Sequence, residues 1–335
     1  MRKEIEARVE KAIAENVFPG CVIGVARANG EREVAPFGHL TYDSDSPVVR
    51  EDTVYDLASI TKSIPVASLA LLFIEQGRLR LADKATNYLP ALKNDYGVTV
   101  EDLLTYRVSG LRLSTLQDQT PDGILRSIFE HGFDGPPGGA NYSNLPALLL
   151  GIILERVTGN TLDALAQKYF FEPLKMKNTT FFPDVGSYEL PTSTIAPTEV
   201  VDGKEVRGVV HDESARKFFR AHRAVGHAGL FSTAPDILNF LEALLRGKFP
   251  AVFSGAQKGL GWQRAESWFM GKNFGEGAFG KTGFTGTSVA VDPLRGVALV
   301  ILSNRTYPNR PPDAASIHSA VNTFRADVAD ICFSA

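Results

Sequence analysis

Hydrophobic positions change from helical to strand spacing near the start of the chain. Apolar residues recur at intervals of three and four over residues 2–15, which predicts an amphipathic helix. The apolar stretch 21–26 and the stretch 31–37 then flank the turn signal Asn29-Gly30. Two such stretches around Asn-Gly predict a β-hairpin. The chain therefore opens with a helix that leads into two antiparallel strands.

Helical patterns dominate the middle of the chain. A nearly continuous apolar face over residues 59–76, closed by Gly77, predicts a helix that is buried on most sides. Residues 177–223 contain several prolines, and we expect mostly loops there. Further helices are predicted at residues 145–158, 161–170 and 233–246.

Strand patterns return from Phe279 onwards. Residues 285–292 and 297–303 predict two strands joined by a turn, and a last helix is predicted over residues 313–331. Strands at both chain ends with helices between them predict one sheet built from both termini.

These elements predict an α+β fold, an α/β sandwich in which the N- and C-terminal helices flank an antiparallel sheet and an all-helical domain is inserted. We expect residues 1–58 and 226–335 to form the discontinuous sheet domain and residues 59–225 the inserted domain, with the site of chemistry at their interface. The length of 335 residues suits two domains or one large one, and 44% hydrophobic residues are ample for the core.

Charge and hydropathy exclude several classes of function. The 35 Lys and Arg residues nearly balance 38 Asp and Glu residues and are spread along the chain, which argues against a nucleic-acid partner. The longest apolar runs, Val66–Ile74 and Leu145–Leu154, are shorter than the ~18–20 residues of a membrane span, so no membrane association is expected. The charged N-terminus has no signal-peptide pattern. We therefore expect a cytoplasmic protein, with a previously removed leader as the alternative.

Two binding patterns are rejected on their context. Residues 275–282 match the phosphate-loop pattern G-x-x-x-x-G-K-T, but a strand pattern follows where that loop needs a helix. The six histidines form neither H-E-x-x-H nor an i, i+4 pair. We therefore expect no metal and no cofactor.

Ser59 and Lys62 form an S-x-x-K pattern at the start of the predicted buried helix. One helical turn places both side chains on the same face, about 5–6 Å apart at Cβ. Burial makes a lysine easier to deprotonate, so Lys62 can take the proton of Ser59 and activate it as a nucleophile. On this pattern alone, a capping serine beside a solvent-facing lysine stays open.

Two further motifs follow in order, Tyr142-Ser143-Asn144 and Lys281-Thr282-Gly283. With S-x-x-K, Y-x-N and K-T-G together, the sequence resembles the serine β-lactamase and penicillin-binding-protein superfamily, on its class C side, which includes family VIII carboxylesterases and D-alanyl-D-alanine peptidases. The resemblance extends over about residues 10 to 325, with similar stretches at 56–62, 142–159, 171–176, 228–233 and 281–305.

The resemblance implies roles for the catalytic groups. Ser59 attacks the carbonyl and becomes acylated, and Lys62 and Tyr142 share the role of general base. Lys281 is expected to lower the pKa values of both groups through its positive charge and to hold a substrate carboxylate.

It also implies the substrate contacts. Asn144 is expected to hydrogen-bond Lys62 or a substrate amide, and Thr282 and Gly283 are expected beside the substrate. The backbone N–H groups of Ser59 and Phe284 would form the oxyanion hole. His211 is a further candidate at the edge of the site, although loop hydrogen bonding is the favoured interpretation of His211-Asp212-Glu213.

Two departures from the family pattern bear on the substrate. Tyr106 stands where the family segment L-L-T-H-T-S-G-L has histidine, and Lys281 stands where many esterase relatives have histidine. Lys281 favours a carboxylate-bearing substrate, whereas the lack of a leader favours an intracellular esterase.

The leading hypothesis is a carboxylesterase that works through an acyl-enzyme. The alternatives are a class C-type β-lactamase or D-alanyl-D-alanine carboxypeptidase, and a non-catalytic penicillin- or peptide-binding protein. The partner is then a small-molecule ester, β-lactam or peptide.

Overall fold

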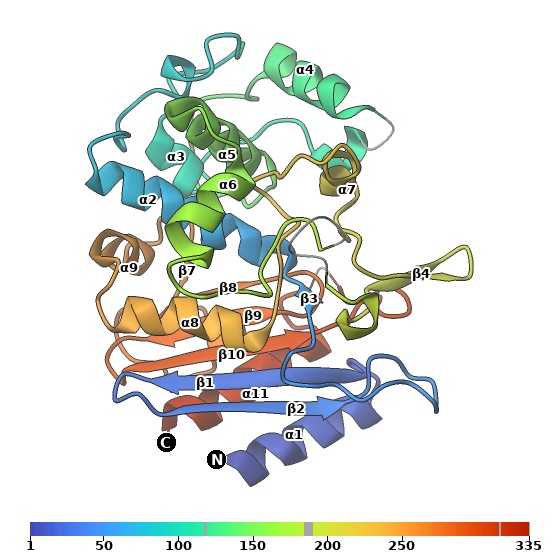
Figure 1. Cartoon of the computed structure of the whole chain (residues 1–335). Helices are drawn as coiled ribbons and strands as arrows, with labels where there is room; N and C mark the ends of the chain where they lie inside the picture. Colours follow the sequence, from blue (N-terminus) through green and yellow to red (C-terminus); the bar gives the residue numbers. More distant parts are fainter. Residues whose placement is uncertain (117–118, 184–189, 315, 335) are drawn as a thin grey trace.

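A six-stranded antiparallel sheet built from both ends of the chain organises the fold (Figure 1). The computed structural model describes residues 1–116, 119–183, 190–314 and 316–334. The strand order is β2-β1-β10-β9-β8-β7, so the predicted single sheet is confirmed. The strands are β1 (Gly20–Arg27), β2 (Arg32–Gly38), β7 (Gln263–Arg264), β8 (Phe279–Thr282), β9 (Ser288–Asp292) and β10 (Val297–Ser303).

Helices cover both faces of this sheet (Figure 1). The terminal helices α1 (Arg2–Ala14) and α11 (Ala320–Ser334), with α10 (Ser267–Met270), pack on one face. Helix α8 (Ala234–Leu245) packs on the other face, between the sheet and the remaining helices. The predicted sandwich with flanking terminal helices is therefore confirmed.

Alternation along β1 divides the core into two hydrophobic clusters. Cys21 and Ile23 point to the terminal helices, whereas Val22 and Ala26 point to the α8 side. A strand places successive side chains on opposite faces, so an uninterrupted apolar run marks a strand that is covered on both sides.

The helical part lies on the α8 side of the sheet (Figure 1). Of the two short strand pairs outside the main sheet, one lies within residues 59–225, so the prediction of an all-helical insertion is wrong in this detail. The domain boundaries themselves stay a prediction. The helices are α2 (Ser68–Glu75), α3 (Val100–Leu104), α4 (Pro121–His131), α5 (Leu145–Thr158), α6 (Leu162–Ala166), α7 (Glu213–Arg220) and α9 (Pro250–Gln257). Shorter turns are η3 (Ala85–Asn87), η4 (Leu113–Leu116), η5 (Gln167–Phe171) and η7 (Thr192–Thr194), and the strand pairs are β3 (Tyr55–Asp56) with β6 (Phe231–Ser232) and β4 (Glu199–Val201) with β5 (Lys204–Val206).

The helix predicted over residues 59–76 is broken into three pieces. A 3-10 turn η1 (Ala58–Lys62) and a π turn η2 (Ser63–Ala67) precede α2. Ile64 has non-helical φ and ψ of −116° and 108°, because proline at position 65 disfavours a helical conformation in the residue before it. By length and composition, residues 58–75 could cross a membrane, but 83% of this segment is buried inside the protein, as in a core helix.

Three other element predictions need correction. Residues 285–287 form a turn rather than the start of β9. Helix α11 begins at Ala320 rather than at residue 313, and the side chain of Asp313 accepts a hydrogen bond from the N–H of Ala320 instead. The predicted loop region 177–223 contains the β4–β5 hairpin and α7, and its residues 184–189 lie outside the described part.

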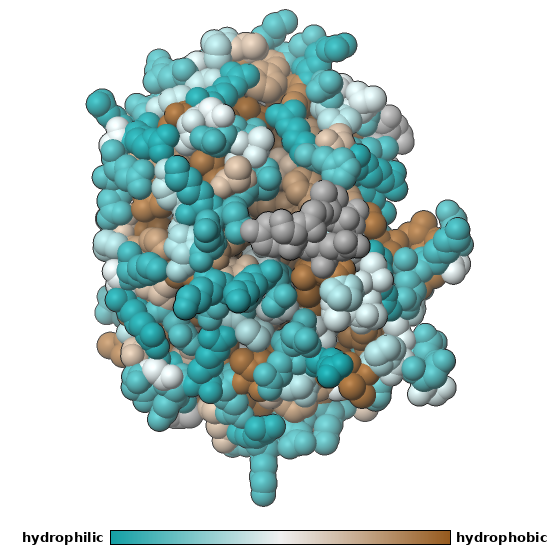
Figure 2. Space-filling model, viewed as in Figure 1, coloured by the Kyte–Doolittle hydropathy of each residue, from teal (hydrophilic) through white to brown (hydrophobic). Residues whose placement is uncertain are grey.

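The visible surface is mainly hydrophilic, with small hydrophobic areas between the polar side chains (Figure 2). The exposed large hydrophobic side chains include Val48, Val201 and Leu294, from separate segments. Scattered apolar residues of this kind are normal for a folded protein.

We predict that Phe18→Ala destabilises the sheet layer. Phe18 is fully buried, and its ring packs edge-to-face on Phe324 at a centroid distance of 4.9 Å. Removing a buried phenylalanine ring costs about 3–5 kcal/mol in the free energy of unfolding. Urea unfolding followed by circular dichroism measures this loss. Val48→Ala is the control, because Val48 is 60% exposed and its replacement should change stability by less than about 0.5 kcal/mol. Equal effects would contradict the assignment of Phe18 to the core.

Candidate active site

Ser59 lies at a strained turn that presents its side chain at the start of η1. The preceding residue, Ala58, has a left-handed φ of 46°. Its N–H donates to Asp56 Oδ1 at 2.8 Å, and Asp56 Oδ2 accepts from the N–H of His211 at 2.8 Å. A non-glycine residue at positive φ persists only where its surroundings hold it, and such residues gather at functional sites. The carboxylate of Asp56 therefore fixes the approach to Ser59.

Lys62 is buried directly beside Ser59. Its Nζ donates to Ser59 Oγ at 2.9 Å and to the carbonyl oxygen of His227 at 2.6 Å, and the residue is 1% exposed. Burial lowers the pKa of Lys62 to about 7, and the charge of Asp212 acts in the opposite direction. A large fraction of Lys62 is therefore neutral near pH 7 and can accept a proton from Ser59.

Tyr142 completes the group around the serine. Its ring centroid lies 5.4 Å from Lys62 Nζ. Burial of its hydroxyl end raises the pKa of Tyr142 to about 12, and a hydrogen bond with Ser59 works against this rise. The residue as a whole is 55% exposed. The expected net lowering of the Tyr142 pKa is wrong, because loss of hydration is the largest cause of the shift and raises the pKa.

Lys281 lies between two tyrosine rings. Its Nζ is 4.6 Å from the ring centroid of Tyr142 and 4.8 Å from that of Tyr106, and the two rings are 5.2 Å apart. The residue is 1% exposed, and burial together with the charge of Lys62 lowers its pKa well below the usual value. Tyr106 was noted in the sequence only as a departure from the family pattern, and its place in the site was missed.

The turn after K-T-G touches the nucleophile segment. Lys281 and Thr282 are the last two residues of β8, Gly283 follows directly, and the N–H of Thr282 donates to Gln263 Oε1 at 3.3 Å. A Cβ on Gly283 would lie 2.4 Å from the carbonyl oxygen of Leu57, so only glycine allows this approach.

The same turn is anchored from several sides. The hydroxyls of Thr285 and Thr287 donate to the carbonyl oxygens of residues 56 and 57, at 2.7 and 3.1 Å. From α11, the buried Arg325 Nη2 donates to the carbonyl oxygens of Gly283 and Thr287, at 2.9 and 2.7 Å. Within the described residues, the N–H groups of Ser59 and Phe284 have no hydrogen-bond acceptor. Both donors are therefore free for an oxyanion.

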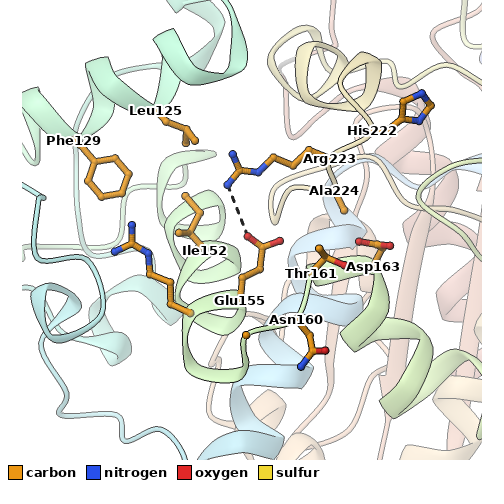
Figure 3. Close-up of a pocket in the computed structure, with 12 residues that line it drawn as sticks. Leu125, Phe129, Ile152, Glu155, Asn160, Thr161, Asp163, His222, Arg223 and Ala224 are labelled. Atoms are coloured by element: carbon orange, nitrogen blue, oxygen red, sulfur yellow. Dashed lines mark ion pairs between the residues drawn. The ribbon is translucent and has the colours of Figure 1, made fainter.

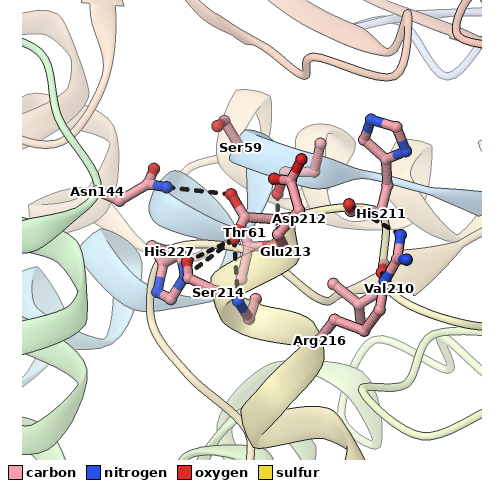
Figure 4. Close-up of polar contacts among 12 residues, drawn as sticks. Ser59, Thr61, Asn144, Val210, His211, Asp212, Glu213, Ser214, Arg216 and His227 are labelled. Carbon is pink, nitrogen blue, oxygen red and sulfur yellow. Dashed lines mark hydrogen bonds and ion pairs between the residues drawn. The ribbon is translucent and has the colours of Figure 1, made fainter. Parts of the chain in front are cut away.

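Asn144 contacts a carboxylate rather than Lys62. Its Nδ2 donates to Asp212 Oδ2 at 3.0 Å (Figure 4), so the expected hydrogen bond to Lys62 is wrong. The short amide side chain at the start of α5 is held by the residue that caps α7. Ser214 Oγ also donates to Asp212, at 2.7 Å, and His227 Nε2 lies 3.4 Å from it. The sequence interpretation of His211-Asp212-Glu213 as a loop segment missed this cluster.

His211 lies beside the candidate oxyanion hole. Its ring stacks on Phe284 at a centroid distance of 5.7 Å and an angle of 20°, and the residue is 2% exposed. Burial lowers the pKa of His211 to about 4, although the carboxylate of Glu199, 3.6 Å from Nδ1, acts in the opposite direction. The ring is therefore neutral at pH 7. Substrate binding by His211 stays a prediction.

A separate hollow lies away from this site. This hollow of about 520 Å³ opens between α4, α5 and the start of α6 (Figure 3), and none of the motif residues lines it. Among the described residues, no group of three or more His, Cys, Asp or Glu side chains could hold a metal ion. The groups available for chemistry at the site are Ser59 and its neighbours.

We predict that Gly283→Ala lowers kcat for a p-nitrophenyl ester about 10²–10³-fold, the usual cost of losing an oxyanion donor. The added Cβ would meet the carbonyl oxygen of Leu57 at 2.4 Å, so the turn and the N–H of Phe284 must move. Gly135→Ala is the control, since its Cβ would meet no atom within 4 Å. Unchanged kcat in the Gly283 variant would contradict the assigned oxyanion hole.

Comparison with known proteins places this arrangement in a family. The chain is 27% identical to N-acetylmuramyl-L-alanine amidase from Bacillus subtilis (strain 168), over 91% of this chain and 81% of the relative. It is 28% identical to a putative D-alanyl-D-alanine carboxypeptidase from Escherichia coli (strain K12), over 76% of this chain and 70% of the relative. The structure of EstCE1, a hydrolase with promiscuous acyltransferase activity, superposes with a TM-score of 0.73 at 20% identity, over 99% and 98% of the two chains, which is a likeness of fold. Residues 5–322 match the Beta-lactamase family, and the chain therefore belongs to that family.

Proposed function

We propose that the protein is a serine hydrolase that acts on esters through an acyl-enzyme. The observation that carries this proposal is the hydrogen bond of 2.9 Å between Lys62 Nζ and Ser59 Oγ. A nucleophile within hydrogen-bond reach of a base whose pKa is near 7 is the arrangement that nucleophilic catalysis needs. The same geometry argues against the non-catalytic binding protein, which has no need of a buried base.

The acylation step follows from the positions of these groups. Ser59 Oγ bonds to the substrate carbonyl carbon while its proton passes to the neutral amine of Lys62. The carbonyl oxygen becomes an oxyanion, which accepts hydrogen bonds from the N–H groups of Ser59 and Phe284. The bond to the leaving alkoxide then breaks, and the proton on Lys62 reaches that alkoxide through the hydroxyl of Tyr142.

Deacylation reverses the roles of the same groups. A water oxygen bonds to the acyl carbon while its proton returns through Tyr142 to Lys62, and the ester bond to Ser59 breaks as Oγ regains a proton. The raised pKa of Tyr142 supports a phenol that stays protonated and relays protons, while Lys62 is the proton store.

The surroundings of Lys281 support a neutral substrate. A substrate carboxylate is held by a charge-assisted hydrogen bond, which requires the charged ammonium form of the lysine. Lys281 is instead buried between the rings of Tyr106 and Tyr142, and its lowered pKa disfavours the charge. This environment favours uncharged acyl esters over β-lactams and peptides that end in a carboxylate. The leading function is therefore a carboxylesterase.

A second candidate function is hydrolysis of an amide in a cell-wall fragment. It is favoured by the similarity to the Bacillus subtilis amidase, which extends over 91% of this chain. An acyl-enzyme made by Ser59 serves amides as well as esters, provided that Tyr142 delivers a proton to the leaving amine. Parallel kinetics with p-nitrophenyl butyrate, nitrocefin, a D-Ala-D-Ala peptide and N-acetylmuramyl-L-alanine would rank the candidates.

We predict that Ser59→Ala abolishes covalent labelling and turnover while the fold is retained. Among the described residues, the Oγ of Ser59 is the one hydroxyl that accepts a hydrogen bond from the buried base Lys62. Intact-mass spectrometry after treatment with a fluorophosphonate should show one adduct on the unmodified sequence and on the control Ser44→Ala, whose serine is exposed. The Ser59 variant should show none. An adduct that survives in this variant would contradict the proposed nucleophile.

We predict that Tyr106→Ala widens the substrate range towards carboxylates. Removing one ring exposes Lys281, and a charge-assisted hydrogen bond from its ammonium is worth about 1.5–3 kcal/mol. KM for nitrocefin should fall about tenfold, and KM for p-nitrophenyl butyrate should stay unchanged. Tyr96→Ala is the control, because Tyr96 is 50% exposed and outside the site. If the unmodified protein already turned over nitrocefin with the higher kcat/KM, β-lactam hydrolysis would replace ester hydrolysis as the leading function.

A further inference from the structure

We propose that the buried carboxylate of Asp212 is a positioning residue of the reaction: it orients Asn144 and His227 and supplies the negative charge that balances the buried Lys62. This inference rests on the proposed acyl-enzyme function, in which Lys62 is the base. It assigns a catalytic purpose to a segment that the sequence patterns present only as a loop.

Groups from separate segments converge on Asp212 (Figure 4). Asn144 Nδ2 at the start of α5 donates to Oδ2 at 3.0 Å. Ser214 Oγ and the N–H of Ala215, both from α7, donate to Oδ1 at 2.7 and 2.9 Å. His227 Nε2 lies 3.4 Å from Oδ1 and 3.0 Å from Ser214 Oγ. One carboxylate thus joins α5, α7 and the segment before β6.

His227 connects this carboxylate to the base. Its side chain faces Asp212, and its carbonyl oxygen accepts the hydrogen bond from Lys62 Nζ at 2.6 Å. The residue is fully buried, and Nδ1 has no hydrogen-bond partner among the described residues. The orientation of the ring therefore depends on its contacts through Nε2. Displacing the ring would also displace the carbonyl group that holds Lys62.

The negative charge of Asp212 acts on the buried amine of Lys62. Two buried amines, Lys62 and Lys281, lie close enough for the charge of Lys62 to lower the pKa of Lys281. Although burial alone raises the pKa of Asp212, hydrogen bonds from His227, Ser214 and the N–H of Ala215 hold it well below the usual range. Asp212 is therefore ionised, and its charge raises the pKa of Lys62.

Other charged and titratable groups face this cluster and contribute to the electrostatic potential at Lys62 and Asp212. Tyr142 and Lys281 face Lys62, and His227 faces both Lys62 and Asp212. The groups around the Asp212 side are Asp56, Glu199, His211, Glu213, Arg216 and Arg310. The charge of Asp212 is the one that acts on Lys62 most strongly among the described residues.

Asp212 is also the N-cap of α7, so a test has to separate capping from catalysis. Asparagine and serine cap helices about as well as aspartate does. Asp212→Asn therefore keeps the cap and removes the charge, and Asp212→Ser keeps the cap and removes both the charge and the second oxygen that contacts Asn144. Asp330→Asn is the matched control, because Asp330 accepts hydrogen bonds from two backbone N–H groups next to α11, on the opposite side of the sheet.

The experiment is the pH dependence of kcat/KM for p-nitrophenyl butyrate. In the unmodified protein kcat/KM should rise with pH through about 7, as Lys62 loses its proton. In Asp212→Asn and Asp212→Ser the midpoint should move to lower pH by about one unit, the lower end of the effect of a nearby opposite charge. Asp330→Asn should leave the midpoint in place.

The outcomes are distinct. A midpoint that stays in place in both Asp212 variants, with a folded protein by circular dichroism, would overturn the inference and leave Asp212 as a helix cap. A midpoint that moves to higher pH would overturn it as well. If the unmodified protein neither turns over the ester nor labels at Ser59, the proposed function fails instead.

Discussion

A lysine amine that is removed from water loses its hydration, and the protein has to replace those interactions. Lys62 is 1% exposed, and its replacements are the Oγ of Ser59 and the carbonyl oxygen of His227. Much of the surrounding structure is arranged to provide these two contacts. The turn at Ala58 presents Ser59, and the Asp212 cluster places His227. The cost of burial is also what makes the amine reactive, because it lowers the affinity of Lys62 for a proton near neutral pH.

The fold was largely predictable because local sequence patterns indicate most of its helices and strands. The helix over residues 2–15, the hairpin around Asn29-Gly30 and the helix closed by Gly159 all follow from apolar spacing and turn residues that act on their near neighbours. The single sheet followed from strands at both chain ends. The break at Pro65 was equally local, since the residue before proline avoids the helical region, and the apolar run around it concealed that signal.

The site was predictable only in part. Ser59, Lys62, Tyr142 and Lys281 were found because motifs of fixed spacing carry them, and the structure brings these four together. The lowered pKa of Lys62 followed from its place on a buried helix, whereas the raised pKa of Tyr142 did not, since its loss of hydration depends on packing that spacing does not reveal. Contacts between distant segments were also hidden: Asn144 and Asp212 are 68 positions apart, and no pattern links them.

The anchoring of the turn after K-T-G has a consequence for synthesis of the chain. Arg325, on the C-terminal helix α11, holds the carbonyl groups of Gly283 and Thr287, and β10 must pair with β1 before the sheet can close. A nascent chain carries Ser59 and Lys62 long before these parts leave the ribosome. Domains fold as units during translation, so the surroundings of Ser59 can be completed only after α11 has emerged. A nascent chain in which Ser59 and Lys62 have emerged but α11 has not therefore lacks the anchored turn that carries the N–H of Phe284.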